Sequence, residues 1–221
     1  MIYENIGSVK VYPDNTTESK ERGYLREHTL QVILNGKTVY SIVCTGSHLE
    51  EMAVGRLYTD RRIDPCSIET ECTGEVVYVT AKECTRSLAK LPRTDIGSDE
   101  VFRLAKVFAH HSGLHEVTNT VHKAILSHSG NDIIFEDISR HNTVDKAVGY
   151  AILNDIPLSE CVLFTSGRIP VDMADKVISA GIPVLVSKSL PTADAVRYAA
   201  EYGLKLICRA WEDSYECGFE K

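Results

Sequence analysis

The sequence predicts an α/β protein in which helices cover a largely parallel or mixed sheet, with a smaller α+β portion before it. Two observations support this prediction. After about residue 130, short apolar runs alternate with amphipathic helical segments, which is the pattern of strand–helix–strand units. Before residue 95, the pattern is instead a hairpin, one helix and a further strand. We therefore divide the chain into an N-terminal α+β portion, residues 1–95, and an α/β domain, residues 96–221.

The N-terminal portion begins with a polar arm. Residues 1–23 carry few apolar repeats, and we interpret them as poorly anchored, with one strand around Ser8–Tyr12. Leu30–Cys44 is then apolar on both sides of Asn35-Gly36, a dipeptide that favours tight hairpin turns. This stretch predicts two paired strands.

A helix and a strand complete the N-terminal portion. Ser47 is the expected N-cap of the helix, because Glu50 follows three residues later and apolar residues recur at helical spacing. Glu75–Ala81 is rich in β-branched residues and predicts a strand.

The α/β domain begins with a helix that Ser98 caps and Gly113 ends. A second helix follows Phe135, because its apolar residues recur at helical spacing. The other expected strands and helices, in chain order, are Asn131–Phe135, Cys161–Thr165, Val171–Ala180, Pro183–Ser187, Thr192–Tyr202 and Leu204–Ala210.

Composition excludes several classes of protein. A net charge of −7 and a pI near 5.6 argue against a general nucleic-acid binder, which needs a basic face. No apolar run reaches the length of a membrane span, and the first residues lack the apolar core of a signal peptide. We therefore expect a cytoplasmic protein with no membrane partner. The seven cysteines form no C-x-x-C pair, so we expect free thiols and no structural zinc or other metal site.

Two polar loops follow predicted strands at the positions where α/β sheets collect ligands. Thr165–Pro170 contains Gly167 and Arg168, and Ser187–Thr192 contains Lys188. Glycine allows close backbone approach, and guanidinium and ammonium groups bind phosphate. Serine and threonine also cap helices routinely, and for either loop alone capping is the favoured interpretation. Two such loops on one sheet edge shift the balance toward an anion site.

A third polar segment, "FEDISRHNTVDKAVG", also begins at the end of a strand. Arg140, His141 and Asn142 would open its helix beside the other two loops. His141 and Asp145 are four residues apart and share a helix face, while Asp137 can cap the helix or orient Arg140. A salt-linked, solvated helix start is the alternative. His122 nearby fits a core histidine as well as a site residue.

These motifs, in this order, resemble the FdhD/NarQ family of formate dehydrogenase accessory sulfurtransferases. The family pattern E-D-[IV]-G-R-H-N-A-V-D-K matches Glu136–Lys146, and its S-G-R and A-G-I-P-V-L-x-S-x-S-A-P-T blocks match "SGRIP" and "AGIPVLVSKSLPT". "NGKTVYSIVCTGSHLEEMAVGRLYTD" and "TNTVHKAI" resemble two further blocks. The likeness runs from about Leu30 to Ile207.

The resemblance implies a cytidine-deaminase-like three-layer α/β core without catalytic zinc. It implies a sulfur carrier that takes persulfide sulfur from a cysteine desulfurase and passes it to the molybdenum bis-guanine dinucleotide cofactor of formate dehydrogenase. It further implies a homodimer. The residues expected to hold the cofactor are Arg140, His141, Asn142, Ser166, Gly167, Arg168, Lys188 and Ser189, together with Arg209, Ala210, Trp211, Glu212, Asp213 and Ser214 in the C-terminal segment.

The sulfur-carrying residue of the family belongs to a C-x-x-C motif. Here the matching segment, "AKECTRSLAK", has only Cys84, and Ser87 stands where a second cysteine would be. Lys82 and Arg86 would stabilise a Cys84 thiolate, whereas Glu83 opposes its ionisation. We predict Cys84 as the catalytic residue, at the mouth of the cofactor site.

Two other departures concern the ligand. Ser139 replaces a glycine of the main motif and restricts backbone approach, and Glu212 and Asp213 make the C-terminal segment less favourable to phosphate. Trp211 can instead stack on a guanine or pterin ring. One alternative is therefore a binding module that holds a guanine nucleotide or the molybdenum cofactor without transferring sulfur. A hydrolytic deaminase is disfavoured, because the H-x-E and P-C-x-x-C zinc motifs are absent.

Overall fold

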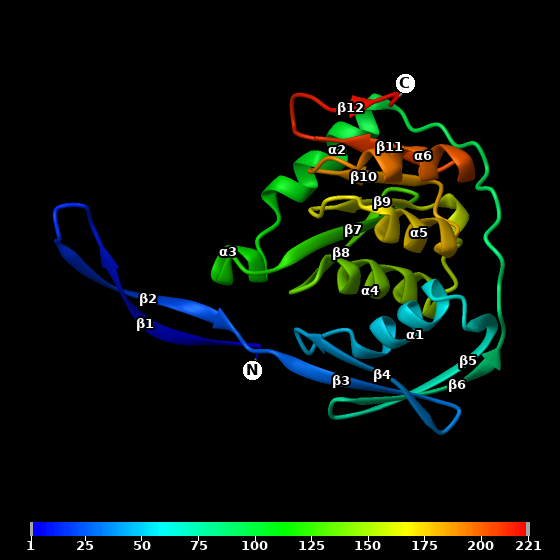
Figure 1. The fold of residues 1–221 in the computed structure, drawn as a ribbon, viewed down its shortest axis with the longest axis horizontal. Helices are drawn as coiled ribbons and strands as arrows, with labels where there is room; N and C mark the ends of the chain where they lie inside the picture. Colours follow the sequence, from blue (N-terminus) through cyan, green and yellow to red (C-terminus); the bar gives the residue numbers. More distant parts are fainter. Residues whose placement is uncertain (1, 220–221) are drawn as a thin grey trace.

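The computed structural model describes residues 2–219, which form three sheets (Figure 1). The strands are β1 (Tyr3–Val11) and β2 (Thr17–Leu25) in the first sheet; β3 (His28–Leu34), β4 (Lys37–Cys44), β5 (Ile63–Thr73) and β6 (Val76–Glu83) in the second; and β7 (His122–His128), β8 (Asn131–Asp137), β9 (Val162–Thr165), β10 (Val184–Ser187), β11 (Lys205–Cys208) and β12 (Glu216–Cys217) in the third.

The six-stranded sheet has the order β12-β11-β10-β9-β7-β8. Its strands β9, β10 and β11 are parallel, whereas β7 pairs antiparallel with both β8 and β9, and β12 antiparallel with β11. The predicted mixed sheet is therefore confirmed. Because β8 runs in the same direction as β9, the carboxyl ends of β8, β9, β10 and β11 lie at one edge.

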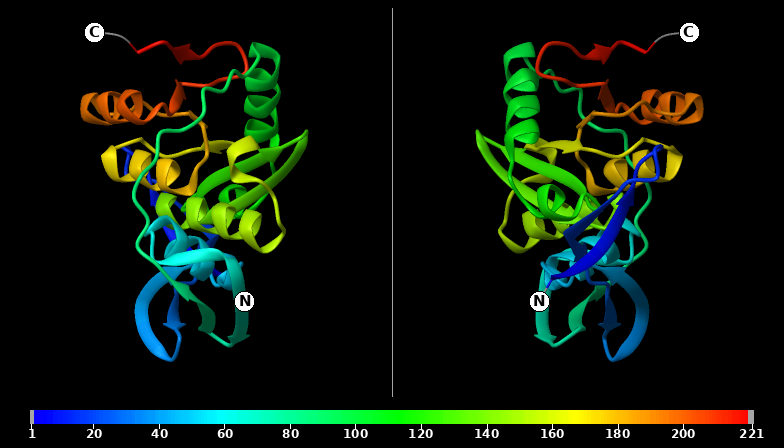
Figure 2. Two further views of the ribbon diagram at one scale, coloured as in Figure 1. Left: turned by 90° about the vertical axis from the view of Figure 1, so that its right-hand side faces the viewer. Right: turned by 90° about the vertical axis from the view of Figure 1, so that its left-hand side faces the viewer.

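Helices cover both faces of this sheet, as Figure 2 shows. Successive residues of a strand point to opposite faces, so Leu163 packs in the cluster under α4, α5 and α6, and Phe164 packs in the cluster under α2. The bounds of these helices are α2 (Ser98–His110), α4 (Arg140–Leu153), α5 (Val171–Ala180) and α6 (Ala193–Tyr202), and two short helices are α3 (Leu114–Thr118) and η1 (Leu158–Glu160).

Helix α1 (Leu49–Thr59) lies between the four-stranded sheet and α4. The two helix backbones touch at two glycines: a Cβ atom on Gly55 would lie 1.8 Å from the Asp145 carbonyl oxygen, and one on Gly149 would lie 1.7 Å from that of Glu51. Any side chain at either glycine would push the helices apart. The N-terminal sheet is thereby fixed closely to the α/β part, while the division near residue 95 stays a prediction.

Two buried ion pairs lie beside this crossing. The Lys146 ammonium is 2.6 Å from Asp137 and also donates to the Thr45 hydroxyl. The Lys176 ammonium is 2.6 Å from Asp145. All four charged side chains are at least nine-tenths buried, so each pair compensates a charge that would otherwise be costly in the interior.

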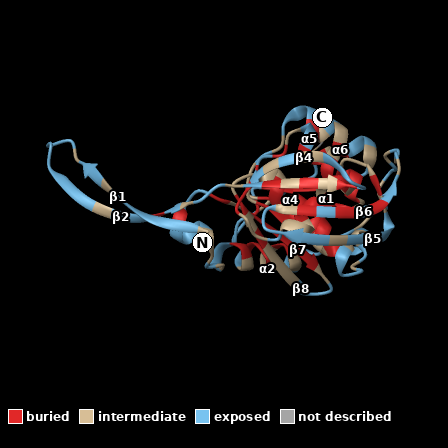
Figure 3. Ribbon diagram, turned by 90° about the horizontal axis from the view of Figure 1, so that it is seen from below, coloured by how far each residue is buried: buried red, intermediate tan, exposed pale blue. Residues whose placement is uncertain are grey.

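The N-terminal arm is a two-stranded hairpin that projects from the body (Figures 1 and 3). The single strand expected at Ser8–Tyr12 was too short, because β1 covers Tyr3–Val11 and pairs along its whole length with β2. The arm contacts the body at its base, where Gly23 packs against Val117 of α3. Most of its residues are exposed, which agrees with its polar sequence.

Other expectations need correction. Ser47 does not cap α1; the helix begins after His48, whose φ is 52°, and the Ser47 hydroxyl accepts from Lys146. Gly97 rather than Ser98 is the N-cap of α2, and Gly113 precedes α3 instead of ending α2. Strand β5 was missed. In residues 2–219, no helix is long and apolar enough to cross a membrane.

Candidate functional site: a cationic cradle

Four loops meet at the edge where β8, β9, β10 and β11 end (Figure 1). The first two loops are in close contact, because a Cβ atom on Gly167 would lie 2.8 Å from Cδ of Arg140. Glycine at this position is what allows the arginine stem to lie against the backbone. The other two loops line an open pocket of ≈ 390 Å³ with the loop after β9. We define the cationic cradle as Arg140, Arg168, Lys188, Arg209 and Trp211.

Serine hydroxyls hold the loops of the cradle together. The Ser189 hydroxyl donates to the Ser166 carbonyl oxygen at 3.0 Å, and the Ser187 hydroxyl donates to the Gly167 carbonyl oxygen at 2.8 Å. The Gly167 N–H in turn donates to the Thr165 hydroxyl at 3.1 Å. The structure thus places Ser166, Gly167 and Ser189 at the site, with these groups engaged between loops. The basic side chains of Arg168, Lys188 and Arg209 line the pocket.

Lys188 and Trp211 form one wall. The Lys188 ammonium lies 4.1 Å from the centroid of the Trp211 ring, within the range of a cation–π contact. Burial lowers the pKa of Lys188, and the Glu212 carboxylate opposes this shift. The Trp211 side chain remains 44% exposed, so the indole is accessible to a second flat group.

The rest of the C-terminal segment surrounds this wall. Ala210 is buried, and its N–H donates to the Ser187 carbonyl oxygen at 3.0 Å. Glu212 lies 3.2 Å from His110 of α2. The residues Glu212, Asp213 and Ser214 line a neighbouring pocket on the α2 side of Lys188 and Trp211. The two acids are therefore separated from Arg140 and Arg168 by this wall.

The first turn of α4 differs from the expected arrangement. Ser139 is the N-cap, and its hydroxyl accepts from the His141 N–H at 3.3 Å. The His141 ring does not pair with Asp145; its Nε2 lies 3.0 Å from Asp172 of α5. Asp145 is withdrawn into the buried pair with Lys176. His141 is half-buried at the margin of the cradle.

Asn142 and Asp137 have structural contacts. The Asn142 amide donates to the Val43 carbonyl oxygen and to Asp137, both at 2.8 Å, so it joins β4 to α4 and is buried. Asp137 pairs with Lys146 and does not orient Arg140. The Arg140 Nε is buried and has no hydrogen-bond partner among residues 2–219. The Nε atoms of Arg56 and Arg86 are in the same state, so this feature is not particular to the cradle.

His122 is a site residue that sequence reasoning left open. Its Nδ1 lies 3.0 Å from the Ser166 hydroxyl oxygen. Burial lowers the pKa of His122, and the positive charge of Arg140 lowers it further. The structure explains its place: His122 is the first residue of β7, and the antiparallel pairing of β7 with β9 brings it to the end of β9.

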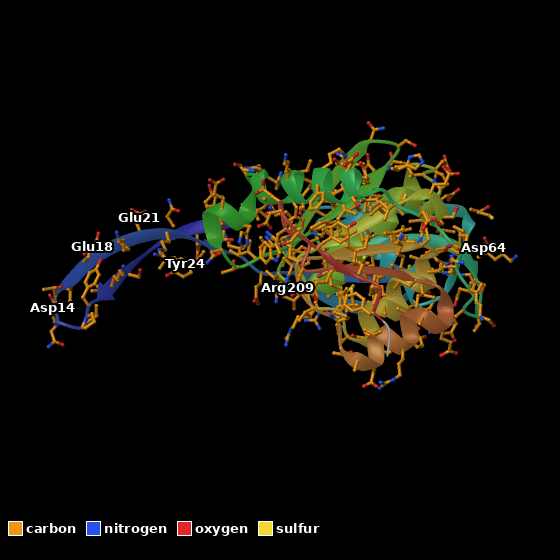
Figure 4. All side chains as sticks on the ribbon, turned by 90° about the horizontal axis from the view of Figure 1, so that it is seen from above. Asp14, Glu18, Glu21, Tyr24, Asp64 and Arg209 are labelled. Atoms are coloured by element: carbon orange, nitrogen blue, oxygen red, sulfur yellow. The ribbon has the colours of Figure 1, made fainter. Side chains whose placement is uncertain are left out.

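Cys84 lies far from the cradle. It follows β6, and its N–H donates to the Arg62 carbonyl oxygen at 2.9 Å. Arg86, two residues later, donates to the carbonyl oxygen of Ser179, near the end of α5. Because α5 starts at the cradle and its ten residues span about 15 Å, Cys84 belongs to the opposite end of the sheet. In Figure 4, Asp64, which neighbours Lys82, and Arg209 of the cradle lie at opposite ends of the body.

The expected position of Cys84 at the mouth of the cradle is therefore wrong within one chain. The basic neighbours are also engaged elsewhere. Lys82 lies 3.7 Å from Asp64, and the Arg86 guanidinium stacks on the Tyr58 ring at 3.7 Å. Cys84 itself is partly exposed and free. Its role in sulfur transfer stays a prediction.

A comparison with protein families matches residues 64–217 to the model of the FdhD/NarQ family. This match spans more than half of the chain. The chain belongs to the FdhD/NarQ family. The Protein FdhD of Methanocaldococcus jannaschii is 31% identical to it over 185 residues, which cover 82% of this chain and 81% of the relative. The sulfur carrier protein FdhD of Halalkalibacterium halodurans is 28% identical over 227 residues, covering 86% and 84% of the two chains.

The fold also matches a solved structure. A crystal structure from Desulfotalea psychrophila, described as that of a formate dehydrogenase accessory protein, superposes with a TM-score of 0.90. It covers 98% of this chain and 97% of the other, at 23% sequence identity. This likeness establishes that the FdhD/NarQ chain described here shares that mixed α/β fold.

Proposed function

We propose that this protein is a sulfur carrier that serves a formate dehydrogenase. It receives persulfide sulfur from a cysteine desulfurase on Cys84 and passes that sulfur to a molybdenum bis-guanine dinucleotide cofactor held in the cationic cradle. The family membership supports this proposal, as do several relatives that are named sulfur carrier proteins. We extend the proposal to a cytidine-deaminase-like core, which is supported by the mixed sheet with helices on both faces.

One observation carries the ligand part of the proposal: four basic side chains from four separate loops gather at one edge of a chain with a net charge of −7. Like charges repel, so gathering them without a bound anion is unfavourable. Phosphate groups would offset that repulsion, and the guanidinium groups of Arg168 and Arg209, which line the pocket, would provide donors for them. The exposed Trp211 ring provides a surface on which guanine can stack.

The residues of the cradle divide between these two tasks. Arg140, Arg168 and Arg209 would bind phosphate oxygens, because their planar guanidinium groups match phosphate geometry. Lys188 and Trp211 would hold the base. His141, Ser166, Gly167 and Ser189 would keep the loops in place, and Asn142 would fix α4 to the four-stranded sheet.

Sulfur loading at Cys84 is a simple exchange. The Cys84 thiolate attacks the terminal sulfur of a persulfide on the desulfurase, the sulfur–sulfur bond of the donor breaks, and the donor cysteine leaves as a thiolate. No net oxidation or reduction occurs. The desulfurase would therefore dock at the end of the molecule that carries β5 and β6.

Mass spectrometry after incubation with a cysteine desulfurase and cysteine tests the loading step. We expect the wild type and Cys66→Ala to gain one sulfur, and Cys84→Ala to gain none. Cys66 is a matched control, because it is a free, exposed thiol of the neighbouring strand β5. Equal loading of all three proteins would remove Cys84 from the mechanism.

Guanosine diphosphate binding tests the cradle. Removing a charge-assisted phosphate contact costs about 1.5–3 kcal/mol, so Arg168→Ala should weaken binding by roughly 10- to 100-fold. Arg197→Ala, on the exposed face of α6, is the control and should leave affinity unchanged. If Arg168→Ala and Arg197→Ala bind equally well, the cradle does not hold the nucleotide.

A second function is favoured by the separation of Cys84 from the cradle. In that case the protein holds a guanine nucleotide or the cofactor without transferring sulfur. Ser87 in place of a second cysteine is consistent with it. This candidate predicts guanosine diphosphate binding together with no sulfur gain on Cys84, so the two experiments above distinguish the candidates.

A further inference from the structure

His122 and Ser166 form a hydrogen-bonded pair beside the cradle. The Nδ1 of His122 lies 3.0 Å from the Ser166 hydroxyl oxygen, and the same oxygen is 3.1 Å from the backbone nitrogen of Lys123. The pair is held on the backbone as well, because the Ser166 N–H donates to the Lys123 carbonyl oxygen at 2.9 Å. The serine is therefore fixed in front of the imidazole.

The hydrogen-bond partners of Ser166 and the lowered pKa of His122 together favour one arrangement of the protons. The Lys123 amide can only donate, so the Ser166 oxygen accepts this bond. His122 Nδ1 and the Lys123 nitrogen are the two partners of the Ser166 oxygen in residues 2–219. The lowered pKa of His122 favours the neutral ring, in which Nδ1 accepts the serine proton. The imidazole is then neutral, with its single proton on Nε2.

Burial and positive neighbours lower the pKa of this imidazole. Arg140 and His141 of α4 and His115 of α3 all disfavour a charge on His122, and burial acts in the same direction. The acid opposite His122 in the β7–β8 pairing is Asp137, but its carboxylate is already paired with Lys146. Asp137 is therefore not free to act as the countercharge of a protonated His122, and no other acid among residues 2–219 raises its pKa.

We propose that His122 and Ser166 are a proton-coupled donor pair, which takes up one proton when a phosphate group binds in the cationic cradle. This inference rests on the proposed function, since it concerns the same ligand. The bound phosphate offsets the charge of Arg140 and supplies the missing countercharge. A proton from the solvent then adds to Nδ1, and no other covalent bond changes.

Protonation reverses one hydrogen bond and releases another donor. The new Nδ1–H donates to the Ser166 oxygen, whose second lone pair still accepts from the Lys123 N–H. The Ser166 O–H is then free to donate to a phosphate oxygen. The pair gains a positive charge and a hydroxyl donor only when the anion is present, which makes His122 a specificity-determining residue for phosphate.

Calorimetric titration with guanosine diphosphate between about pH 5.5 and 8, at constant ionic strength, tests the proposal. Between the pKa values of free and liganded His122, affinity should fall by about tenfold per pH unit as the pH rises. His122→Gln should lose this part of the dependence. His128→Gln is the matched control, because His128 is at the other end of β7 and contacts Glu160. The nucleotide phosphate also titrates in this range, but its contribution to the pH dependence is the same in all variants and cancels when they are compared.

Two further measurements distinguish failure of this inference from failure of the proposed function. Histidine NMR should show the pKa of His122 rising on addition of guanosine diphosphate, and proton uptake measured in buffers of different ionisation enthalpy should fall in His122→Gln relative to His128→Gln. Equal proton uptake by these two variants would overturn this inference alone. Failure of the wild type to bind guanosine diphosphate at any pH would overturn the proposed function and this inference with it.

Discussion

The cradle end and the cysteine end of the molecule are built in different ways. At the cradle end, serine hydroxyls tie the loops after β9 and β10 together, and basic side chains from four loops converge. At the cysteine end, Cys84 stands alone after β6, and its basic neighbours are engaged with Asp64, Tyr58 and Ser179. The candidate site for a large anion is thus preorganised, whereas the Cys84 thiol is partly exposed and, within residues 2–219, has no neighbouring groups arranged around it.

Under the proposed function, this difference corresponds to a division between binding of the cofactor and collection of sulfur. Binding needs several donors held in fixed positions, so it uses loops anchored on a rigid sheet. Thiol exchange needs one accessible sulfur that a partner can approach, so a partly exposed cysteine beside an edge of the four-stranded sheet suffices.

The largest expected effect comes from the joint between the two ends. Lys146→Met leaves the Asp137 carboxylate buried and unpaired, which should lower the free energy of unfolding by about 3–5 kcal/mol. Lys205→Met, whose partner Asp95 is exposed, should cost at most about 1 kcal/mol. Urea unfolding followed by circular dichroism measures both. Similar losses in the two variants would mean that the buried pair does not stabilise the joint.

A smaller effect is expected from the base-binding wall of the cradle. Stacking of a base on an aromatic side chain contributes about 1–3 kcal/mol, so Trp211→Ala should weaken guanosine diphosphate binding by roughly tenfold or more. Trp211→Tyr keeps a ring and should retain most of the affinity. Binding of inorganic pyrophosphate, which has no base, should be much less sensitive to either change. An equal loss for pyrophosphate would show that Trp211 acts on the phosphate side.

The buried thiols of Cys161 and Cys208 should make the protein sensitive to alkali. Burial raises the pKa of Cys161 to about 12 and that of Cys208 to about 12, from an ordinary value of 9.0. A raised native pKa means that the unfolded chain loses its thiol protons first, so stability is lost as the pH rises from about 9 toward 12. At pH 10 the loss should be about 1 kcal/mol for each thiol. Cys208→Ala should reduce this slope relative to the exposed control Cys217→Ala, as measured by urea unfolding; identical slopes would contradict it.

The smallest effect concerns the basic neighbours of Cys84. Arg86 already contacts Tyr58 and Ser179, so Arg86→Ala should change the rate of persulfide loading by less than about twofold. The measurement is a time course of sulfur gain by mass spectrometry. A loss of tenfold or more would show that Arg86 activates the thiol and that the cysteine end is organised like the cradle.

The sequence predicted the α/β part of the fold well for physical reasons. Alternation between apolar strands and helices closed by Gly181 and Gly203 is a local signal, and both glycines have positive φ at helix ends. Asn35-Gly36 marked the β3–β4 turn for the same reason. The polar sequence of β5, with Pro65 and mostly exposed residues, carried no such signal and was missed.

For the candidate site, the sequence predicted the positions of the loops but not the contacts between distant segments. Loop positions at the ends of parallel strands follow from topology, so the convergence of Arg140, Arg168 and Lys188 could be anticipated. Contacts between distant segments could not. Nothing local in the sequence shows that Asn142 bonds to Val43 or that Asp145 pairs with Lys176. The distance from Cys84 to the cradle also depends on how α1 crosses α4, which a single sequence does not reveal.

That crossing has a consequence for how sulfur travels. The backbones of α1 and α4 touch at Gly55 and Gly149. The four-stranded sheet and the six-stranded sheet on either side are therefore packed rigidly against each other, with no hinge between them. Bending the body cannot close the gap between thiol and cradle. If sulfur passes from Cys84 to the cradle of the same chain, as proposed, the moving part would be the segment after β6, which has no regular structure from residue 84 to residue 97, or the cofactor itself.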